Sequence, residues 1–336
     1  MIGRSYYIFL AVGVILVTAI LATYFFHSAP VQESTSDSAD ISWQYISVDS
    51  PLQPIPSVQN LDPDWVNLGR ALFHSPLLSK DNTISCASCH LVHFGGDDSF
   101  PVSTGIENKV GSRNSPSVLN AVFNFRQFWD GRSLDLKEQI AGPVHNPVEM
   151  GSSWQEIVAK LENSTDFVGM FASVTPDGIN EETISNAIVA YETSLTTPNA
   201  PIDAYIQGDQ NALNPQQKRG LQKFTDFGCV ACHQGVNIGG NLFQKIGRIG
   251  EIPEVLADDL GRFTITGNEY DKYVFKVPSL RNVALTGPYF HNGAVAELSE
   301  AVKIMAKMQL GREISQRDTD DIVALLQSFT GDTSDL

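Results

Sequence analysis

The pentapeptide Cys86-Ala87-Ser88-Cys89-His90 decides the fold, together with a second copy at Cys229-Val230-Ala231-Cys232-His233. Each follows the pattern Cys-x-x-Cys-His, which is typical of covalent haem c attachment. Two thiols at this spacing can bond to the two vinyl groups of one porphyrin, and the adjacent histidine can ligate the iron. A zinc site usually needs four ligands, and a redox dithiol needs no histidine. Because the two runs contain all four cysteines, we expect two haem c groups.

The composition limits the function. The chain has 336 residues, 42% of them hydrophobic, and a net charge of −16. This length allows two compact domains with their own cores. Nucleic-acid binding requires a basic surface, so the acidic balance argues against a nucleic-acid partner. An acidic surface is compatible with docking of a small basic redox protein.

The N-terminal 27 residues are predicted to form a cytoplasmic stub and a transmembrane anchor. Residues 6–26 form a stretch of 21 residues without a charge, close to the roughly 20 that span a bilayer. A cleaved secretion signal usually has a shorter apolar core, so we favour an uncleaved anchor. Arg4 precedes the span and no Lys or Arg follows until Arg70, which favours a body on the periplasmic side of a bacterial inner membrane.

The remainder is predicted to be mainly α-helical, in two cytochrome c-like domains. Residues 28–60 are rich in Ser, Asp, Gln and Pro, which indicates a flexible tether that buries little. Folding is expected to begin where Asp62 caps a helix with Pro63 in its first turn. The run 196–201 contains two prolines and separates domain 61–200 from domain 201–331.

Helix signals place the residues that surround the two haem runs. Asn180 can cap one helix and Asn214 another, which leads to the second run. Leu298, Val302 and Met305 share one helical face that ends near residue 311. Two prolines in the run 142–150 predict that Glu149 lies on a constrained loop rather than a helix.

The sixth ligands of the two irons determine what they can do, because an iron with two strong ligands transfers electrons and an open one can react. After the second run, His291, Met305 and Met308 are the candidates. Methionine sulfur favours ferrous iron, but methionines on an amphipathic helix are more often core residues. Glu149 is equally ambiguous, because a loop carboxylate can simply cap a helix or pair with arginine.

Longer strings around both runs carry a resemblance to a known family. The first half contains Arg113-Asn114-Ser115-Pro116, Gln127-Phe128-Trp129-Asp130-Gly131-Arg132, and a run from Gly142-Pro143 to Val148-Glu149-Met150. The second contains Val277-Pro278-Ser279-Leu280-Arg281-Asn282-Val283, Pro288-Tyr289-Phe290-His291-Asn292-Gly293, and Glu300-Ala301-Val302-Lys303-Ile304-Met305. In order and spacing these strings resemble the bacterial dihaem cytochrome c peroxidases from about residue 61 to 330.

The resemblance implies an enzyme that reduces hydrogen peroxide to water. The N-terminal haem would be peroxidatic, and the C-terminal haem would receive electrons from a small donor such as a cytochrome c or a cupredoxin. His90 and His233 match the proximal ligands, and Met305 matches the distal ligand of the electron-transfer haem. A homodimer is usual in this family.

Further positions match the family's active site and a calcium site. Glu149 and Gln139 match the polar pair on the peroxide side of the first haem, and Trp129 matches the tryptophan between the haems. An interdomain calcium ion is implied, with ligands from the side chain of Asn114 and the carbonyls of Thr286 and Pro288. Calcium favours such oxygen ligands.

One position departs from the family pattern. Many members hold a distal histidine on the oxidised peroxidatic iron and release it when the other haem is reduced. The matching position is Ile106, and His93 lies too close to His90 to replace it. We therefore expect that the first haem is not locked by a histidine and reacts without reductive activation.

Two other functions compete with the peroxidase. A relative of the methylamine-utilisation dihaem enzyme would oxidise a protein substrate, but that enzyme carries a tyrosine ligand where Met305 stands here. In a dihaem electron carrier without catalysis, Glu149 and Gln139 would have no function, because the haem would be closed to substrate.

Overall fold

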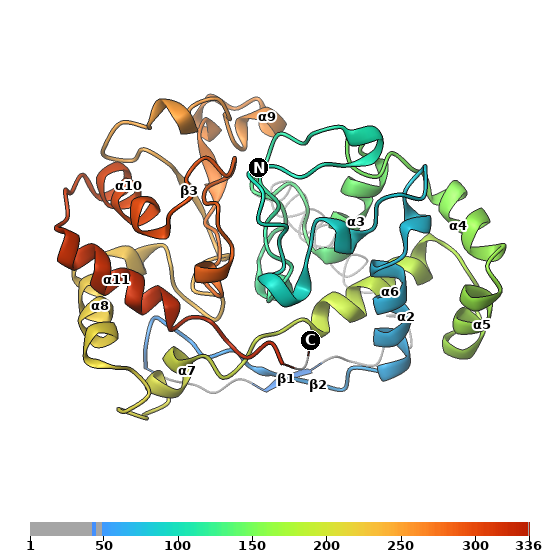
Figure 1. Ribbon diagram of the computed structural model, residues 1–336, viewed down its shortest axis with the longest axis horizontal. Coiled ribbons are helices and arrows are strands. Elements are labelled where there is room, and N and C mark those ends of the chain that lie inside the picture. The colour runs from blue at the N-terminus through green and yellow to red at the C-terminus, as the bar shows by residue number, and fades with distance from the viewer. Residues whose placement is uncertain (1–41, 45–48, 335) are drawn as a thin grey trace, which may run out of the picture. The chain divides into compact units, whose positions relative to one another are not determined.

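The computed structural model describes residues 42–44, 49–334 and 336 (Figure 1). Residues from Ile41 to Leu336 form one compact unit. The predicted anchor, residues 1–27, and most of the predicted tether lie outside the described residues. Within the part of the chain that is described, no helix is both long enough and apolar enough to cross a membrane.

The described chain is mainly helical, as predicted. Its helices are α2 (Pro63–Phe73), α3 (Leu136–His145), α4 (Trp154–Glu162), α5 (Thr165–Val174), α6 (Glu181–Ser194), α7 (Pro201–Ile206), α8 (Pro215–Asp226), α9 (Phe263–Thr266), α10 (Leu298–Leu310) and α11 (Gln316–Gln327). Two antiparallel strand pairs join β1 (Ser42–Gln44) to β2 (Ser57–Gln59), and β3 (Phe243–Lys245) to β4 (Val274–Lys276).

Side-chain caps begin the helices where the sequence predicts them. Asp62 accepts a hydrogen bond from the N–H of Asp64 at the start of α2, which has Pro63 in its first turn. Asn180 caps α6 and Asn214 caps α8. Each cap satisfies backbone donors that the first turn of a helix leaves free.

Helices α2 and α6 cross with their backbones in contact in the first half of the chain (Figure 1). A β-carbon at Gly69 of α2 would lie 1.8 Å from the carbonyl oxygen of Ala187 in α6. Only glycine permits this approach, which explains a helix-weakening residue in the middle of α2. The pair lies in a hydrophobic core that includes Leu68, Leu72, Phe73, Ile140, Met150, Trp154, Ile157, Phe171, Ile184, Ile188 and Tyr191.

Helices α8 and α11 repeat the same contact in the second half. A β-carbon at Gly220 of α8 would lie 2.0 Å from the carbonyl oxygen of Asp321 in α11. A second hydrophobic core surrounds this pair and includes Leu52, Ile202, Leu213, Phe224, Ile238, Ile322, Leu325, Leu326 and Phe329. The two cores contain buried residues from separate stretches of sequence, apart from Leu52.

Thr197, in the segment predicted to separate the halves, is bonded to both. Its hydroxyl accepts hydrogen bonds from the side-chain amides of Asn120 (2.8 Å) and Asn282 (2.9 Å). All three residues are fully buried. The connection is therefore a packed crossing between the halves.

The prediction that residues up to 60 bury little is wrong for the end of the tether. Leu52 and Ile55 are buried, and Leu52 belongs to the second core. The N–H of Gln53 donates to the carbonyl of Gly235 at 3.2 Å, and Gly235 donates to Pro51 at 2.8 Å. Prolines in this stretch signalled a linker, but an extended segment can also pair with a loop and insert single apolar side chains.

The prediction that two prolines exclude a helix before Glu149 is also wrong in part. Helix α3 continues through Pro143 and ends at His145. Proline costs a helix one backbone donor and a steric contact with the preceding turn. Pro143 lies in the last turn of α3, where the disruption affects only the end of the helix. Glu149 follows in a turn in which the N–H groups of Glu149 and Met150 donate to the carbonyls of Asn146 and Pro143.

The glycine contacts can be tested by substitution. We expect Gly69→Ala and Gly220→Ala each to lower the free energy of unfolding by about 3 kcal/mol, because the new methyl group meets backbone that cannot move aside. Gly169→Ala is the matched control, since nothing lies within 4 Å of its added β-carbon in α5. That change should raise stability by up to about 1 kcal/mol. Urea denaturation of the haem-loaded protein measures all three, and equal midpoints would contradict the proposed role of the contacts.

Candidate active site

The first Cys-x-x-Cys-His run follows α2 and forms a short 3₁₀ turn, Cys86–Ser88. The N–H of His90 donates to the carbonyl of Cys86 at 3.0 Å, which folds the histidine back over the cysteines. Nδ1 of His90 lies 3.1 Å from the carbonyl oxygen of Gly96, which can only accept. Nδ1 must therefore carry the proton, and Nε2 is left with a free lone pair for a metal.

The cysteine thiols have the character of buried, neutral groups. Burial raises the pKa of Cys86 to about 12 and that of Cys229 to about 11. Burial likewise raises the pKa of Cys89. Reactive redox cysteines and zinc thiolates need the opposite shift. No group of three His, Cys, Asp or Glu side chains placed for a metal ion occurs among the described residues.

The second run borders a cavity of about 600 Å³. Cys229, Cys232 and His233 line it, and Met305 from α10 lines it as well. Met308 does not line the cavity and is buried, only 1% exposed. The structure thus brings Met305, but not Met308, to the same space as the second histidine. Most of the exposed lining is apolar, which suits a porphyrin.

His233 is neutral at physiological pH. Burial lowers its pKa to about 4, and the backbone near Ile238 and Pro278 offsets the effect only in part. Nδ1 of His233 forms no hydrogen bond with the described residues. A buried neutral imidazole is the form that binds a metal. The residues present around both runs therefore fit haem c.

Glu149 lies in the turn after α3, near the first run. Its charge raises the pKa of Cys89, which places the carboxylate within electrostatic reach of that thiol. Burial raises the pKa of Glu149, although a 2.6 Å hydrogen bond from the Asn146 amide and the charge of Arg132 oppose the change. A carboxyl with a raised pKa can exchange a proton near neutral pH.

Gln139 lies on α3, ten positions before Glu149 (149 − 139). Its side chain is partly exposed and forms no hydrogen bond with the rest of the described chain. An amide without a partner is free to donate a hydrogen bond to a ligand.

Trp129 lies where the two halves meet. Its indole Nε1 donates to the carbonyl of Asn114 at 2.9 Å, and its ring lines the cavity of the second run. The ring packs edge-on against His291, with ring centroids 6.4 Å apart. His291 is itself stacked on Phe275 at 4.6 Å. Three aromatic rings thus extend from the Trp129 loop along the cavity.

The segments that lead into α3 and α10 repeat each other at an offset of 162 positions. Helix α3 begins at Leu136 and α10 at Leu298 (298 − 136 = 162). The bridge between Gln127 and Ser133 recurs between Tyr289 and Val295. Trp129 and His291 are therefore equivalent positions in the two halves.

This offset shows how the halves differ. Met305 is the eighth residue of α10, and the eighth residue of α3 is Pro143 (305 − 162 = 143). Proline has no atom that can ligate iron. Met150, the methionine next to Glu149, is buried in the first core. The first half therefore has no side chain with a possible ligand atom at the helical position where the second half has Met305.

Ile106 packs against the turn that carries Glu149. The N–H of Ile106 donates to the carbonyl of Glu149 at 2.9 Å, and the side chain is buried. A β-carbon at Gly151 would lie 2.4 Å from Cδ1 of Ile106. A hydrocarbon thus fills this position, and hydrocarbon cannot bind iron. His93 is exposed on the surface.

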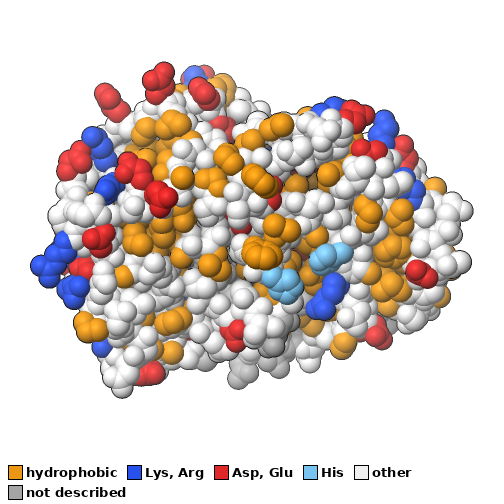
Figure 2. Space-filling view, viewed as in Figure 1, with side chains coloured by type: hydrophobic (Ala, Val, Ile, Leu, Met, Phe, Trp, Pro, Cys, Tyr) orange, Lys and Arg blue, Asp and Glu red, His pale blue; other side chains and the backbone are white. Residues whose placement is uncertain are grey.

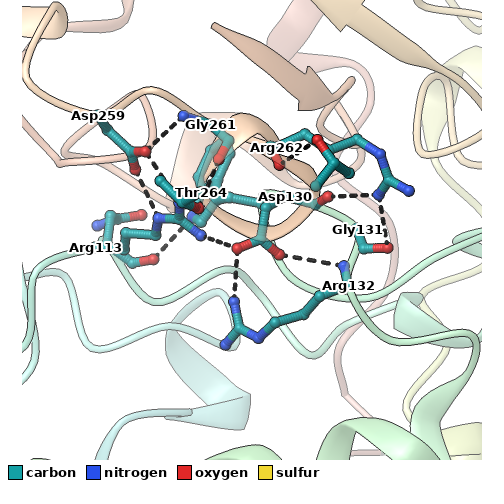
Figure 3. Close-up of polar contacts among 11 residues, drawn as sticks. Arg113, Asp130, Gly131, Arg132, Asp259, Gly261, Arg262 and Thr264 are labelled. Carbon is teal, nitrogen blue, oxygen red and sulfur yellow. Dashed lines mark hydrogen bonds and ion pairs between the residues drawn. The ribbon is translucent and has the colours of Figure 1, made fainter. Parts of the chain in front are cut away.

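A charge network holds the Trp129 loop to the second half (Figure 3). Arg113 donates to both carboxylate oxygens of Asp259, at 2.6 and 3.0 Å, and also to Asp130. Burial opposes ionisation of Asp259, but hydrogen bonds from Arg113 and Gly261 outweigh it and lower its pKa.

Arginines 132 and 262 complete this network. Arg132 donates to Asp130 at 2.8 Å, while Arg262 donates to the carbonyls of Asp130 and Gly131. Asp130 is almost fully buried, and a buried carboxylate needs such partners. Since Asp130 follows Trp129 directly, the network positions the tryptophan.

The three residues matched to a calcium site all line the same cavity. Asn114 is buried, and its side-chain amide nitrogen donates to the carbonyl of Phe100 at 3.0 Å. Thr286 and Pro288 lie close to each other in the loop before α10.

Sequence reasoning missed Asp97. Its side chain is 1% exposed, and neither carboxylate oxygen has a partner among the described residues. Burial raises its pKa to about 6. A β-carbon at Gly95 would lie 3.2 Å from Asp97 Oδ1 and 3.1 Å from the carbonyl of Leu285. The residue before Thr286 therefore lies close to an unpaired carboxylate, which no local pattern could reveal.

Known proteins resemble the chain over most of its length. A sequence profile described as "Di-haem cytochrome c peroxidase" matches residues 63–211. "Cytochrome c peroxidase Ccp" of Escherichia coli K12 is 48% identical over 84% of this chain, which spans only 61% of that protein. "Cytochrome c551 peroxidase" of Pseudomonas aeruginosa is 45% identical over 79% of this chain and 78% of its own length.

A more distant likeness is found among solved structures. The crystal structure of "a MauG-like protein associated with microbial copper homeostasis" has a TM-score of 0.71 and 27% identity, over 85% of this chain and 96% of that one. The description of the profile as di-haem agrees with the two haem-attachment runs. The chain belongs to the di-haem cytochrome c peroxidase family.

Proposed function

We propose that the protein is a dihaem peroxidase that reduces hydrogen peroxide to water with electrons from a small one-electron donor. The observation that carries the proposal is the difference between the two halves at the eighth residue of equivalent helices. Met305 stands at that position in α10 and would supply a ligand atom to the second haem site, while Pro143 stands there in α3 and would supply none to the first. One iron then keeps two ligands and the other has an open face.

Haem bound at the first run would supply an iron that accepts a peroxide oxygen and gives up electrons. Glu149 would take a proton from one oxygen of hydrogen peroxide and return it to the other, which then leaves as water. Gln139 donates a hydrogen bond to the peroxide and orients it. Two electrons and two protons convert each peroxide to two water molecules.

Electrons would enter at the second haem and pass toward the first by way of Trp129. The indole ring lines the cavity of the second run, and Arg113 and Asp130 hold its loop in place. His90 and His233 are proposed as the proximal ligands and Met305 as the distal ligand of the second haem. In this proposal residues 61–200 and 201–331 form the peroxidatic and electron-transfer domains.

A calcium ion between the halves is part of the proposal. Asn114 through its side chain, with Thr286 and Pro288 through their carbonyls, would provide oxygen ligands. Asp97 supports such a site, because its unpaired carboxylate would balance the charge of a cation. Calcium accepts water in the rest of its coordination shell.

The donor would be a cytochrome c or a cupredoxin. Figure 2 shows a face on which acidic and basic side chains are interspersed and apolar side chains are exposed between them. We also propose the uncleaved anchor at residues 6–26, a periplasmic body and a homodimer. The anchor is supported by the uncharged stretch of 21 residues.

The acid–base role of Glu149 can be tested by Glu149→Gln. We expect peroxide turnover with a reduced cytochrome c to fall by about 10²- to 10⁴-fold, because the amide cannot carry the proton. Glu162→Gln, an exposed change on α4, is the control and should keep the wild-type rate. Because burial raises the pKa of Glu149, the wild-type rate should fall on acidification at a higher pH than that of an ordinary glutamate. Equal rates in both variants would contradict the assignment.

The absence of a histidine lock can be tested on the fully oxidised protein. We expect a high-spin signal from the first haem and a reaction with peroxide before any reductant is added, since Ile106 offers no ligand. Ile106→His is the complementary variant, and it should shift that haem toward a low-spin form. Electron paramagnetic resonance reports both. A bis-histidine low-spin first haem in the wild type would sink the hypothesis.

The ligand of the second haem separates a peroxidase from a methylamine-utilisation type of enzyme. We expect Met305→Leu to abolish the low-spin ferrous spectrum of one haem, because a strong ligand is lost. Met308→Leu, one helical turn away and outside the cavity lining, should leave it intact. The reverse pattern would assign the ligand to Met308 and would contradict the inference that the methionine lining the cavity binds the iron.

A further inference from the structure

Lys276 is a buried lysine that no part of the peroxidase chemistry uses. It ends strand β4 and is only 7% exposed. It lines the same cavity as Cys229, His233 and Met305. Its backbone N–H donates to the carbonyl of Trp129 at 2.8 Å, so the residue is attached to the loop between the two haem sites.

The ammonium group of Lys276 has no counter-ion among the described residues. None of the ion pairs or side-chain hydrogen bonds formed by that part of the chain involves its Nζ. Burial lowers its pKa to about 8, with no neighbouring charge acting on it. An unpaired buried ammonium is unfavourable unless it loses its proton or gains an anion.

Arg281 is another buried cation at the same cavity, and unlike Lys276 it has a carboxylate partner. It also lines the cavity and is 3% exposed. Its Nη2 lies 2.7 Å from the carboxylate of Asp203 and donates to the carbonyl of Gln53 at 2.8 Å, while its Nε donates to the carbonyl of Val236 at 3.0 Å. The chain thus supplies a carboxylate for Arg281 and none for Lys276.

A ligand with a carboxylate would give the Lys276 side chain the counter-ion that the chain does not supply. Haem c carries two propionate groups, and its attachment to Cys229 and Cys232 would place it in this space. We propose that the side chain of Lys276 forms an ion pair with a propionate of the second haem. The inference rests on the second haem of the proposed function, but not on peroxide chemistry at the first.

The ion pair would influence the second haem in two ways. A propionate charge near the iron favours the ferric state, and a paired cation offsets that preference. The same lysine would also connect the haem carboxylate to the Trp129 carbonyl, through its side chain at one end and its backbone N–H at the other. Lys276 is thus a positioning residue that sets the potential of the electron-receiving site.

Redox titration of the haem-loaded protein tests the inference, with Lys276→Met to remove the charge and Lys276→Arg to keep it. Lys245→Met is the matched control, because Lys245 lies on the paired strand β3 but is exposed. We expect Lys276→Met to shift the ferric-to-ferrous ratio of the second haem about tenfold toward ferric, or about 59 mV for one electron. Lys276→Arg and Lys245→Met should leave the potential close to wild type.

The pH dependence separates an ion pair from a packing effect. The difference in potential between wild type and Lys276→Met should be largest where both groups of the ion pair are charged. It should fade at low pH, as the propionate is protonated, and at high pH, as Lys276 loses its proton. A redox-difference infrared spectrum should show a shifted carboxylate band in Lys276→Met alone. A haem count of two per chain, measured on each variant, ensures that incomplete loading is not the cause.

Two results would overturn the inference. In one, Lys276→Met keeps the wild-type potential at every pH. In the other, Lys276→Met changes the ligand spectrum of the second haem, which would mean that the lysine binds iron. Neither result bears on the peroxidase itself, which is judged by turnover of the wild-type protein.

Discussion

Each half of the molecule depends on one backbone contact between two crossing helices. In the first half Gly69 of α2 meets Ala187 of α6, and in the second Gly220 of α8 meets Asp321 of α11. The helix that bears the glycine precedes the Cys-x-x-Cys-His run in both cases. Dense packing at the crossing holds that helix in one position, and the cysteines and histidine that follow take their places from it.

On this repeated scaffold, a few side chains separate two chemical roles. The helices that face the two runs begin 162 positions apart (298 − 136) and differ at their eighth residue. In the proposed function Met305 would offer a sulfur to one iron, whereas Pro143 has no atom to offer to the other. The chain then turns after α3 and brings Glu149, a carboxyl with a raised pKa, to the first site. The proposed division between a reacting and a supplying haem therefore needs no difference in fold.

Buried charge is compensated in contrasting ways where the halves meet. Arg113 is held by the carboxylates of Asp130 and Asp259, and Arg281 by that of Asp203. Among the described residues, the carboxylate of Asp97 has no hydrogen-bond partner, and no charged side chain shifts the pKa of Lys276. For Arg113 and Arg281, the chain itself provides the compensating carboxylates. The unpaired lysine and aspartate are the places where a charged ligand would be needed, a propionate for one and a calcium ion for the other.

Features that depend only on residues adjacent in the sequence could be predicted from the sequence alone. The haem runs, the caps at Asp62, Asn180 and Asn214, and the helical character of the chain follow from local backbone chemistry. Spacing on a helical face could not distinguish Met305 from Met308, because both are compatible with a buried face. Only the folded chain separates them, since it forms a cavity that one lines and the other does not.

The tertiary structure also decided features that have no local signal. Proline is a helix breaker by its own chemistry, yet Pro143 is accommodated because surrounding packing outweighs one lost hydrogen bond. Leu52 is buried because a loop 183 positions later in the chain (235 − 52) offers it a surface. Asp97 and Lys276 are isolated from countercharges only once distant segments exclude water around them. Burial is a property of the assembled fold, and the charges that it leaves unpaired cannot be identified in the linear sequence.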